Sequence, residues 1–537
     1  MVSMKKSRKL IAKPVIITVL LVILVAVFPI RRALYYSADP VGEKDCPPFT
    51  PPESDPTKPT RIQMEAPSSL PWEQKGGTVN DASCLNKTPV YGVIAVRGIE
   101  DIQTALTFAR ENGLPVSVAG VKHSMGGQAF ARNAIVLDMT RFNKMSLDEE
   151  GKTLTVQSGA TWHDIQNFLH PKFAVKAMQS TDLFTIGGSI SVNAHGMDHR
   201  AGSVGRTVRS MRVMLPDGSI QTLSRTEHPD LFRRVVGGYG LFGVILEAQI
   251  EVTDNVIYRS ERRIIESKDF PAVFNNEIRP DDKVGLMYGH LSTAPQSFLD
   301  EMILYTYKET GNSAGEIPPL GEVSRVKLRR LLFNLSKQGA LSMRLKWFAE
   351  KYIEPKLESC LVSRNQALGE GEACLVTRNQ PMHDSVRYLK NDLKGETDIL
   401  QEYFIPRDRF MAFVDGMRKI LRDDRANLLN ASVRVVHQED NFLNYAPTDM
   451  FAFVLYLNQT TDEEGNERMG KLTRDLIDLT SDLGGRFFLP YQLHYSGEQL
   501  QRSYPEIKDF FEDKRRYDPT IMLTNTFYEK YSPLFSR

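Results

Sequence analysis

The fold is decided by the stretch Pro115-Val-Ser-Val-Ala-Gly-Val-Lys-His-Ser-Met-Gly-Gly-Gln128, together with a second glycine-rich stretch, Gly187-Gly-Ser-Ile-Ser-Val-Asn-Ala-His-Gly196. Each is expected to form a loop whose backbone N–H groups attract an anion, since glycine lets the backbone come close to a ligand. Neither carries the lysine–serine signature of a phosphate-binding P-loop. Two such loops therefore indicate a long diphosphate ligand rather than ATP.

The elements around these stretches predict an α+β unit over residues 89–253. Isoleucine, leucine and alanine fall on one face of a predicted helix over 98–112, and Gly113 is placed to end it. A second helix over 162–168 should begin after Thr161. Strands are expected at 90–96, 115–119, 135–139, 154–158 and 244–252, with a hairpin over 208–215 and 220–223.

A third glycine motif, Gly238-Tyr-Gly-Leu-Phe-Gly243, has the spelling of a nicotinamide-binding site. That site needs a strand before the glycines and a helix after them. Here a strand is expected to follow, so the sequence does not predict a Rossmann fold.

The composition excludes several classes of function. The chain has 537 residues, with 67 basic and 66 acidic side chains. This balance argues against a nucleic-acid partner. Four cysteines are too few for a disulfide scaffold, and no metal-binding motif is present. His195 and His199 are four residues apart but lack the glutamate of a zinc-binding helix.

The N-terminus differs from the rest of the chain. The run Val15–Ile30 is almost wholly aliphatic, with five basic residues before it and two directly after it. We expect residues 1–35 to be a transmembrane anchor, with a cleaved signal peptide as the alternative and the body outside the cytoplasm. Residues 36–88 are proline-rich and predict a tether. Two disulfides among Cys46, Cys84, Cys360 and Cys374 follow as a hypothesis.

Residues 89–253 resemble the FAD-binding domain of the vanillyl-alcohol-oxidase, or p-cresol-methylhydroxylase (PCMH-type), flavoproteins. The motifs that carry the resemblance are residues 115–124, 136–138, 156–160, 185–188, 202–205, 215–218, 230–232 and 240–245. The resemblance implies FAD as cofactor, with its pyrophosphate wrapped by Ala119, Gly120, Val121, Lys122, His123 and Ser124. It makes His123 a candidate for a covalent bond to the flavin. The remaining candidate FAD-binding residues are Gln128, Thr181, Gly187, Gly188, Asn193, His195, Gly196, Ser203, Val244 and Ile245.

Further motifs resemble decaprenylphosphoryl-ribose 2-oxidases, namely residues 187–205, 402–406, 484–491, 504–505 and 514–519. That branch has a lysine where Tyr491 stands here, and its first loop lacks His123. Polyol and aldonolactone oxidases, which the chain also resembles, carry the loop histidine. Their Glu-x-Arg pair would fall on Ser432-Val-Arg434, without the glutamate. The resemblance implies a substrate cap over residues 254–480 and a C-terminal segment, 481–537, that returns to the FAD domain.

Flavin chemistry then assigns the candidate catalytic residues. Oxidation of a CH–OH group sends hydride to the flavin N5 while a base takes the hydroxyl proton, and a nearby cation stabilises the reduced ring. Arg434, in an alternating strand, is expected to be that cation or a substrate anchor. Tyr491 is expected to hydrogen-bond the substrate or accept its proton, and His494 is a weaker candidate for this work.

We therefore expect a membrane-anchored FAD oxidoreductase acting on a sugar-like, polyol or lipid-linked alcohol, with oxygen, a quinone or a cytochrome as electron acceptor. The alternative is a C=C reductase resembling sterol Δ24-reductases, which would use NADPH. The segment 323–348 is expected to be helical, basic and amphipathic, and it is either a membrane-facing surface or an ordinary solvated face.

Overall fold

The computed structural model describes residue 30 and residues 49–52, 67–311, 317, 319–321, 326–353, 374–383, 393 and 395–536. The expected anchor lies outside these residues apart from residue 30, as do about half of the tether, Cys46 and Cys360. In the described part of the predicted tether, residues 72–75 form a strand that pairs with residues 92–94 of the following domain, so this part belongs to the folded body. Within the described part, no helix has both the length and the apolar character that crossing a membrane requires. Cys84 is disulfide-bonded, which confirms the disulfide hypothesis for one of the four cysteines.

The first part of the domain expected to bind FAD, called the FAD domain below, is a four-stranded sheet in the order β2-β5-β7-β6, in which β5 and β6 run parallel to β7. Its strands are β2 (Trp72–Lys75), β5 (Gly92–Ala95), β6 (Val116–Ala119) and β7 (Ile135–Asp138). Helix α4 (Ile99–Asn112) buries Ile102, Leu106 and two alanines, and ends at Gly113 with φ 63°. That left-handed conformation suits glycine, as predicted. A small sheet of β1 (Phe49–Thr50), β3 (Thr78–Val79) and β4 (Thr88–Pro89) precedes β5.

The second part is a six-stranded antiparallel sheet in the order β12-β11-β13-β9-β8, with β10 also paired to β13. Its strands are β8 (Met145–Asp148), β9 (Thr153–Gln157), β10 (Phe173–Val175), β11 (Val208–Met214), β12 (Ile220–Ser224) and β13 (Val244–Asp254). The helices are α5 (Trp162–Leu169), α6 (Ile186–Ser191), α7 (Val204–Thr207) and α8 (Pro229–Val235). Because β13 directly follows the glycines of 238–243, the third motif does lead into a strand. The α+β fold is confirmed.

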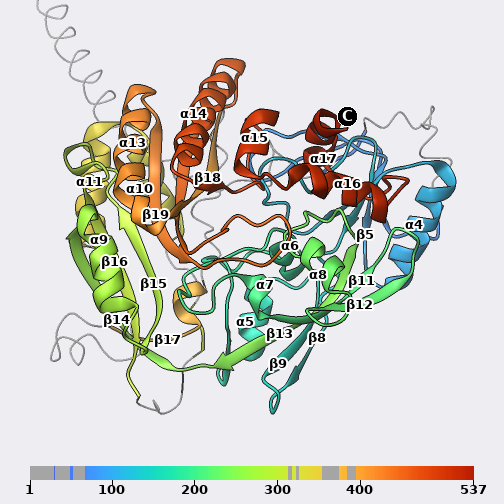
Figure 1. Ribbon diagram of the computed structural model, residues 1–537, viewed down its shortest axis with the longest axis horizontal. Helices are drawn as coiled ribbons and strands as arrows, with labels where there is room; N and C mark the ends of the chain where they lie inside the picture. Colours follow the sequence, from blue (N-terminus) through green and yellow to red (C-terminus); the bar gives the residue numbers. More distant parts are fainter. Residues whose placement is uncertain are drawn as a thin grey trace, which may run out of the picture.

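The cap is an eight-stranded sheet in the order β17-β14-β16-β15-β19-β20-β18-β21. Its strands are β14 (Ile257–Glu266), β15 (Val284–Leu291), β16 (Glu301–Glu309), β17 (Cys374–Thr377), β18 (Glu396–Pro406), β19 (Asn427–Val436), β20 (Met450–Thr460) and β21 (Arg486–Phe487). Helices α13 (Phe410–Asp423) and α14 (Glu463–Asp482) pack together and against β18. The short α9 (Phe270–Val273) lies beside the sheet (Figure 1).

The helical segment predicted over 323–348 is divided in two, α10 (Val326–Ser336) and α11 (Ala340–Tyr352). Gly339, between them, has φ 118°, a conformation that side-chain-bearing residues rarely adopt. One continuous helix is therefore not formed.

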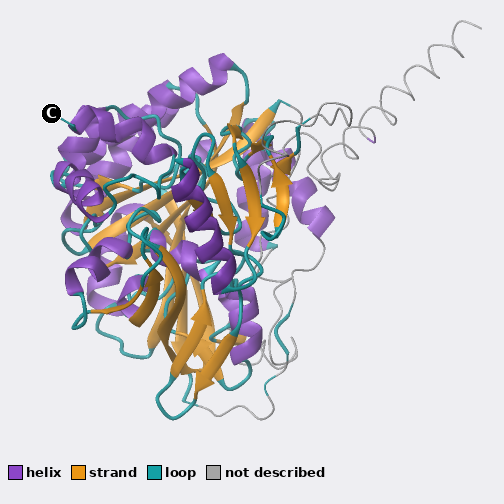
Figure 2. Cartoon of the chain, turned by 90° about the vertical axis from the view of Figure 1, so that its right-hand side faces the viewer, coloured by secondary structure: helices purple, strands orange, loops and turns teal. Residues whose placement is uncertain are grey.

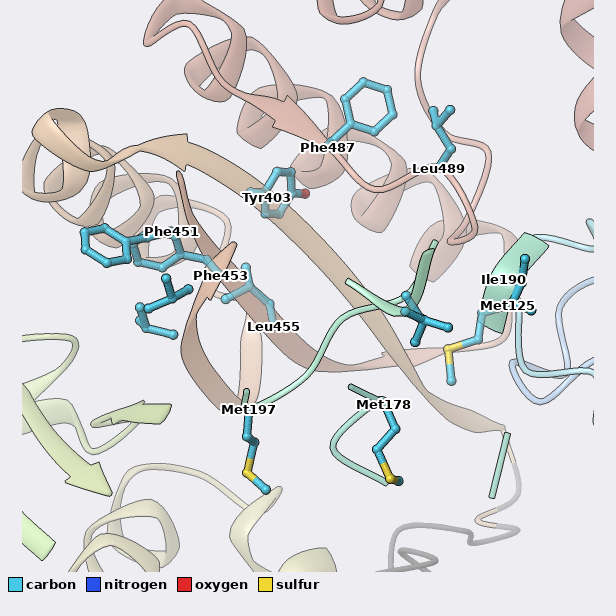
Figure 3. Close-up of a cluster of buried hydrophobic side chains, with 14 of the residues drawn as sticks. Met125, Met178, Ile190, Met197, Tyr403, Phe451, Phe453, Leu455, Phe487 and Leu489 are labelled. Carbon is cyan, nitrogen blue, oxygen red and sulfur yellow. The ribbon is translucent and has the colours of Figure 1, made fainter. Parts of the chain in front are cut away.

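Helices α16 (Ile507–Tyr517) and α17 (Thr526–Tyr531) return to the FAD domain, on the side of α4 and β5 in Figure 1, and Leu523 pairs with Val116 of β6. Helix α15 (Gly497–Ser503) packs against α14 of the cap. In the side view of Figure 2, helices lie on both sides of the strands. One hydrophobic cluster joins the two domains, with Met125 and Ile190 from the FAD domain and Tyr403 and Phe453 from the cap (Figure 3).

Candidate active site

A cavity of about 1980 Å³ lies between the FAD domain and the cap. Its wall includes residues of both predicted glycine stretches, the cap strands β18 and β19, and Tyr491 of the C-terminal segment. A pocket for one drug-sized ligand is typically ~300–1,000 Å³. The cavity is therefore large enough for a dinucleotide and a second molecule.

The first glycine stretch forms the predicted loop, and residues 119–124 all line the cavity. A Cβ on Gly120 would lie 2.1 Å from Thr185 Oγ1, so only glycine lets this loop pack against the start of α6. Lys122 has φ 62° and its ammonium group lies 2.6 Å from Asp138 at the end of β7. The imidazole of His123 lines the cavity with Nδ1 3.0 Å from Val121 O.

The prediction that the second stretch is a loop is wrong for residues 187–191 and confirmed for residues 192–196. Residues 186–191 form helix α6, and a Cβ on Gly187 would lie 2.6 Å from the Cβ of Ser158. Glycine is needed here so that the helix can pack on the end of β9, which is a packing reason and not a loop conformation. Gly187 and Gly188 nevertheless line the cavity, as expected of FAD-binding residues.

The FAD side of the cavity carries hydroxyl groups that lack partners. The side-chain oxygens of Ser124, Ser158, Ser180 and Thr181 are buried and make no hydrogen bond within the described part of the chain, and all four residues line the cavity. Buried polar groups are normally hydrogen-bonded. These hydroxyls and the close-packed backbone at Gly120 fit FAD, whose pyrophosphate and ribityl chain offer many hydrogen-bonding atoms.

On the cap side, Arg434 projects from β19 into the cavity, as its alternating strand predicted. Asn430, Ser432 and Arg434 share one face and all line the cavity. The Arg434 guanidinium makes no hydrogen bond to any described residue, and its Nε is buried without a partner. Burial lowers the pKa of Arg434, and the charge of Glu402 opposes this change. An arginine nevertheless keeps its charge in proteins, so the cavity contains an unsatisfied cation.

Glu402 is the site residue that sequence reasoning missed. It lies on β18, it is 5% exposed, and it faces the cavity. One carboxylate oxygen is 2.6 Å from His195 Nε2 and the other is 3.4 Å from the hydroxyl of Tyr491. Its position directly before the apolar run Tyr403-Phe-Ile405 was a usable signal, because β18 is buried on both faces and a buried acid is costly unless it is paired or functional.

Tyr491 lines the cavity beside Glu402. Burial raises the pKa of its phenol well above the ordinary value, and the charge of Glu402 adds to the shift. A phenol with so high a pKa remains protonated, so on its own it is a poor proton acceptor. The geometry favours the hydrogen-bonding role over the simple proton-acceptor role that the sequence also left open.

The first glycine stretch also holds Tyr491 in place. Gln128 Nε2 donates to Leu489 O at 2.8 Å and to Tyr491 O at 3.0 Å. A Cβ on Gly126 would lie 2.2 Å from Tyr491 O. The FAD-side loop and the catalytic candidate are thus fixed to each other directly.

The remaining residues predicted from the sequence lie partly outside the cavity wall and partly in it. His494 does not line the cavity; it packs against Gly470 of α14, and burial lowers its pKa to about 4. The Asn193 amide donates a hydrogen bond to the Glu439 carboxylate and accepts one from Gly205 N. The Ser203 hydroxyl also donates to the Glu439 carboxylate. Gly196 and Val244 are packing positions outside the cavity wall, whereas Gln128, Thr181, His195 and Ile245 are part of it.

Comparison with known proteins gives a consistent result. Residues 90–224 match the family model described as an FAD binding domain. The chain is 32% identical over 173 residues to an uncharacterised oxidoreductase of the fasciation locus of Rhodococcoides fascians, covering 32% of this chain and 39% of that protein. It is 34% identical over 169 residues to decaprenylphosphoryl-β-D-ribose oxidase of Mycolicibacterium smegmatis, covering 30% and 37%.

A third relative is cytokinin dehydrogenase 2 of Arabidopsis thaliana, 30% identical over 164 residues, covering 30% of this chain and 32% of the relative. The matched part spans two fifths or less of each of these three proteins.

Proposed function

We propose that this protein is an FAD-dependent oxidoreductase that oxidises a CH–OH group of a sugar-like, polyol or lipid-linked alcohol. The match of residues 90–224 to the family model described as an FAD binding domain supports the cofactor. The observation that carries the proposal is the meeting of Arg434, Tyr491 and Glu402 in the cavity that the glycine stretches also line. These side chains supply a cation, a hydrogen-bond donor and a proton acceptor. Each of these groups assists the oxidation of an alcohol by a flavin.

Bound FAD would supply the two-electron oxidant that takes the hydride from the substrate carbon. It would be held by residues 119–124 and by the hydroxyls of Ser158, Ser180 and Thr181. His123 is the candidate for covalent attachment, because its ring lies in the cavity wall within this loop. Acid precipitation of the protein tests that bond, since a colourless pellet with all flavin in the supernatant would contradict it.

The hydroxyl proton has a route through this chain's own residues. The substrate hydroxyl gives its proton to the Tyr491 oxygen while the Tyr491 proton passes to Glu402, so that no free tyrosinate is formed. The separation between Tyr491 and Glu402, 3.4 Å, must shorten in the complex, as catalytic hydrogen bonds often do. The hydrogen bond from His195 Nε2 holds the Glu402 carboxylate in position for this transfer.

Arg434 stabilises negative charge as it develops at the reacting centre. Its guanidinium is already desolvated and has no hydrogen bond to another described residue, so little reorganisation accompanies the reaction. Removal of a preorganised donor of this kind typically costs about 10²–10³ in kcat.

The mouth of the cavity supports the lipid-linked class of substrate. Helices α10 and α11 expose Leu328, Leu332, Leu341, Leu345 and Phe348, each about half or more exposed, and Leu332 and Leu345 also line the cavity. Large exposed apolar patches mark binding surfaces. The exposed side chains of Lys327, Arg329 and Arg344 lie on the same helices, and a basic apolar surface suits an anionic membrane.

An extracytoplasmic, membrane-anchored location belongs to the same proposal. It is supported by the basic residues before the apolar run 15–30, and by the disulfide at Cys84, since disulfides persist in oxidising compartments.

The proposal is tested by anaerobic titration of the purified protein with sugars, polyols, a lipid-linked sugar, sterols and NADPH. An alcohol alone should bleach the flavin. Rapid bleaching by NADPH, with none by any alcohol, would instead support the C=C reductase.

A further inference from the structure

Outside the cavity, two histidines and an aspartate from three separate segments converge. His163 lies on α5, Asp182 lies in the segment before α6, and His383 follows the short 3₁₀ helix of Gln380–Met382 in the cap. His163 Nδ1 is 2.8 Å and His383 Nδ1 is 3.2 Å from the same oxygen of Asp182. The three candidate ligand atoms all lie within 4.8 Å of one another.

Two of the three side chains are buried, His163 is 29% exposed, and one carboxylate oxygen has no partner among the described residues. Asp182 is 0% and His383 is 3% exposed, and the two imidazole rings stack with centroids 4.6 Å apart. The second Asp182 oxygen, Oδ1, is buried and has no hydrogen-bond partner among the described residues. A buried carboxylate is costly unless it is fully paired or coordinates a metal. Gln166 Oε1, 3.1 Å from His383 Nδ1, adds a further oxygen.

We propose that His163, Asp182 and His383 bind a divalent transition metal, with Zn²⁺ as the best match. Imidazole nitrogens select zinc and its transition-metal neighbours over calcium and magnesium. Zn–N and Zn–O bonds of ~2.0–2.2 Å place tetrahedral ligands about 3.3–3.5 Å apart. The 2.8 Å and 3.2 Å separations from each histidine to Asp182 are slightly shorter than this, so the carboxylate and the two stacked rings would move apart and turn toward the metal on binding. The Gln166 amide oxygen lies 3.1 Å from one of these ligand atoms, His383 Nδ1, and water could complete the coordination.

The position of the cluster indicates a structural role. None of the three ligands lines the cavity, but Thr181 and Phe184 on either side of Asp182, and Pro381 beside His383, all do. A metal at this point would join the FAD domain to the cap directly behind the cavity wall. Its loss should loosen the wall and lower stability, without removing any group that touches the substrate.

Metal analysis of the full-length protein, purified without chelators, tests the site. We expect about one Zn²⁺ per chain in the wild type, and in a surface control, His228→Gln, but a loss of most of it in Asp182→Asn and His383→Gln. Added Zn²⁺ should raise the Tm of the metal-stripped wild type, since a ligand that binds only the folded state stabilises it, and a chelator should reverse the rise.

Should a variant fail to fold, the wild-type Tm response still decides the question. Wild-type protein that holds no metal and gains no Tm with Zn²⁺, Co²⁺ or Ni²⁺ would overturn the proposal and leave a hydrogen-bonded cluster. Equal metal content in wild type and Asp182→Asn would also overturn it. Both readouts are independent of flavin chemistry, so the oxidoreductase proposal stands or falls separately.

Discussion

Replacement of Tyr491 by Phe isolates the proton route. The ring keeps its contact with Phe488, whose centroid is 5.8 Å away, and only the hydroxyl is removed. Its hydrogen bond to Glu402, at 3.4 Å, is longer than the ~2.5–3.0 Å of a normal O–H···O bond. The free energy of unfolding should therefore fall by less than the ~1 kcal/mol of an average hydrogen bond. General acid–base groups contribute about 10²–10⁴ to the rate, or roughly 3–5 kcal/mol of barrier, so the chemical step should slow by that factor.

The assay is anaerobic single-turnover reduction of the flavin by the alcohol substrate, with thermal unfolding in parallel. Tyr495→Phe is the matched control, because this tyrosine is also buried and does not line the cavity. It should leave the rate unchanged. A Tyr491→Phe enzyme that reduces its flavin as fast as the control, at equal FAD content, would refute the route through Tyr491.

Three further predictions follow from other parts of the structure. Gly120→Ala should lower FAD content, because the new Cβ would lie 2.1 Å from Thr185 Oγ1; a full complement of flavin, measured as the FAD-to-protein ratio, would contradict this. Burial lowers the pKa of His494 from an ordinary 6.5 to about 4 in the folded protein. Its contribution to the free energy of unfolding is therefore intact above pH 6.5 and is lost as the pH falls toward 4. His494→Gln should flatten the pH dependence of stability in that window by up to about 3 kcal/mol and preserve the rate of flavin reduction. Leu341→Glu with Leu345→Glu, at positions 70% and 61% exposed, should reduce binding to anionic vesicles and turnover of a lipid-linked alcohol, and should leave turnover of a soluble alcohol unchanged. Vesicle binding equal to that of the wild type would contradict a membrane role for this surface.

Local signals predicted the FAD domain well. Helix α4 was predictable because its apolar face, its acidic first turn and its terminal Gly113 all agree. The inward direction of Arg434 followed from strand alternation alone. The second glycine stretch misled because Gly187 serves close packing against Ser158. A sequence does not separate that need from a turn.

The parts of the site that the sequence did not predict depend on contacts between residues that are far apart in the sequence. Glu402 and His195 are 207 residues apart in sequence, and Asp182 and His383 meet only because the cap packs against the FAD domain. No local pattern marks either pair. The division of α10 from α11 at Gly339 depended on one residue, in a segment whose apolar periodicity indicated a single helix.

The visible absorbance spectrum of the purified full-length protein, before and after acid precipitation, tests the central claim most directly. A yellow protein with about one FAD per chain, bound where Gly120 packs on Thr185, is the predicted result. Flavin retained in the pellet would add the bond to His123. A folded protein that is colourless and does not take up added FAD would contradict the account, and the roles of Arg434 and Tyr491 with it.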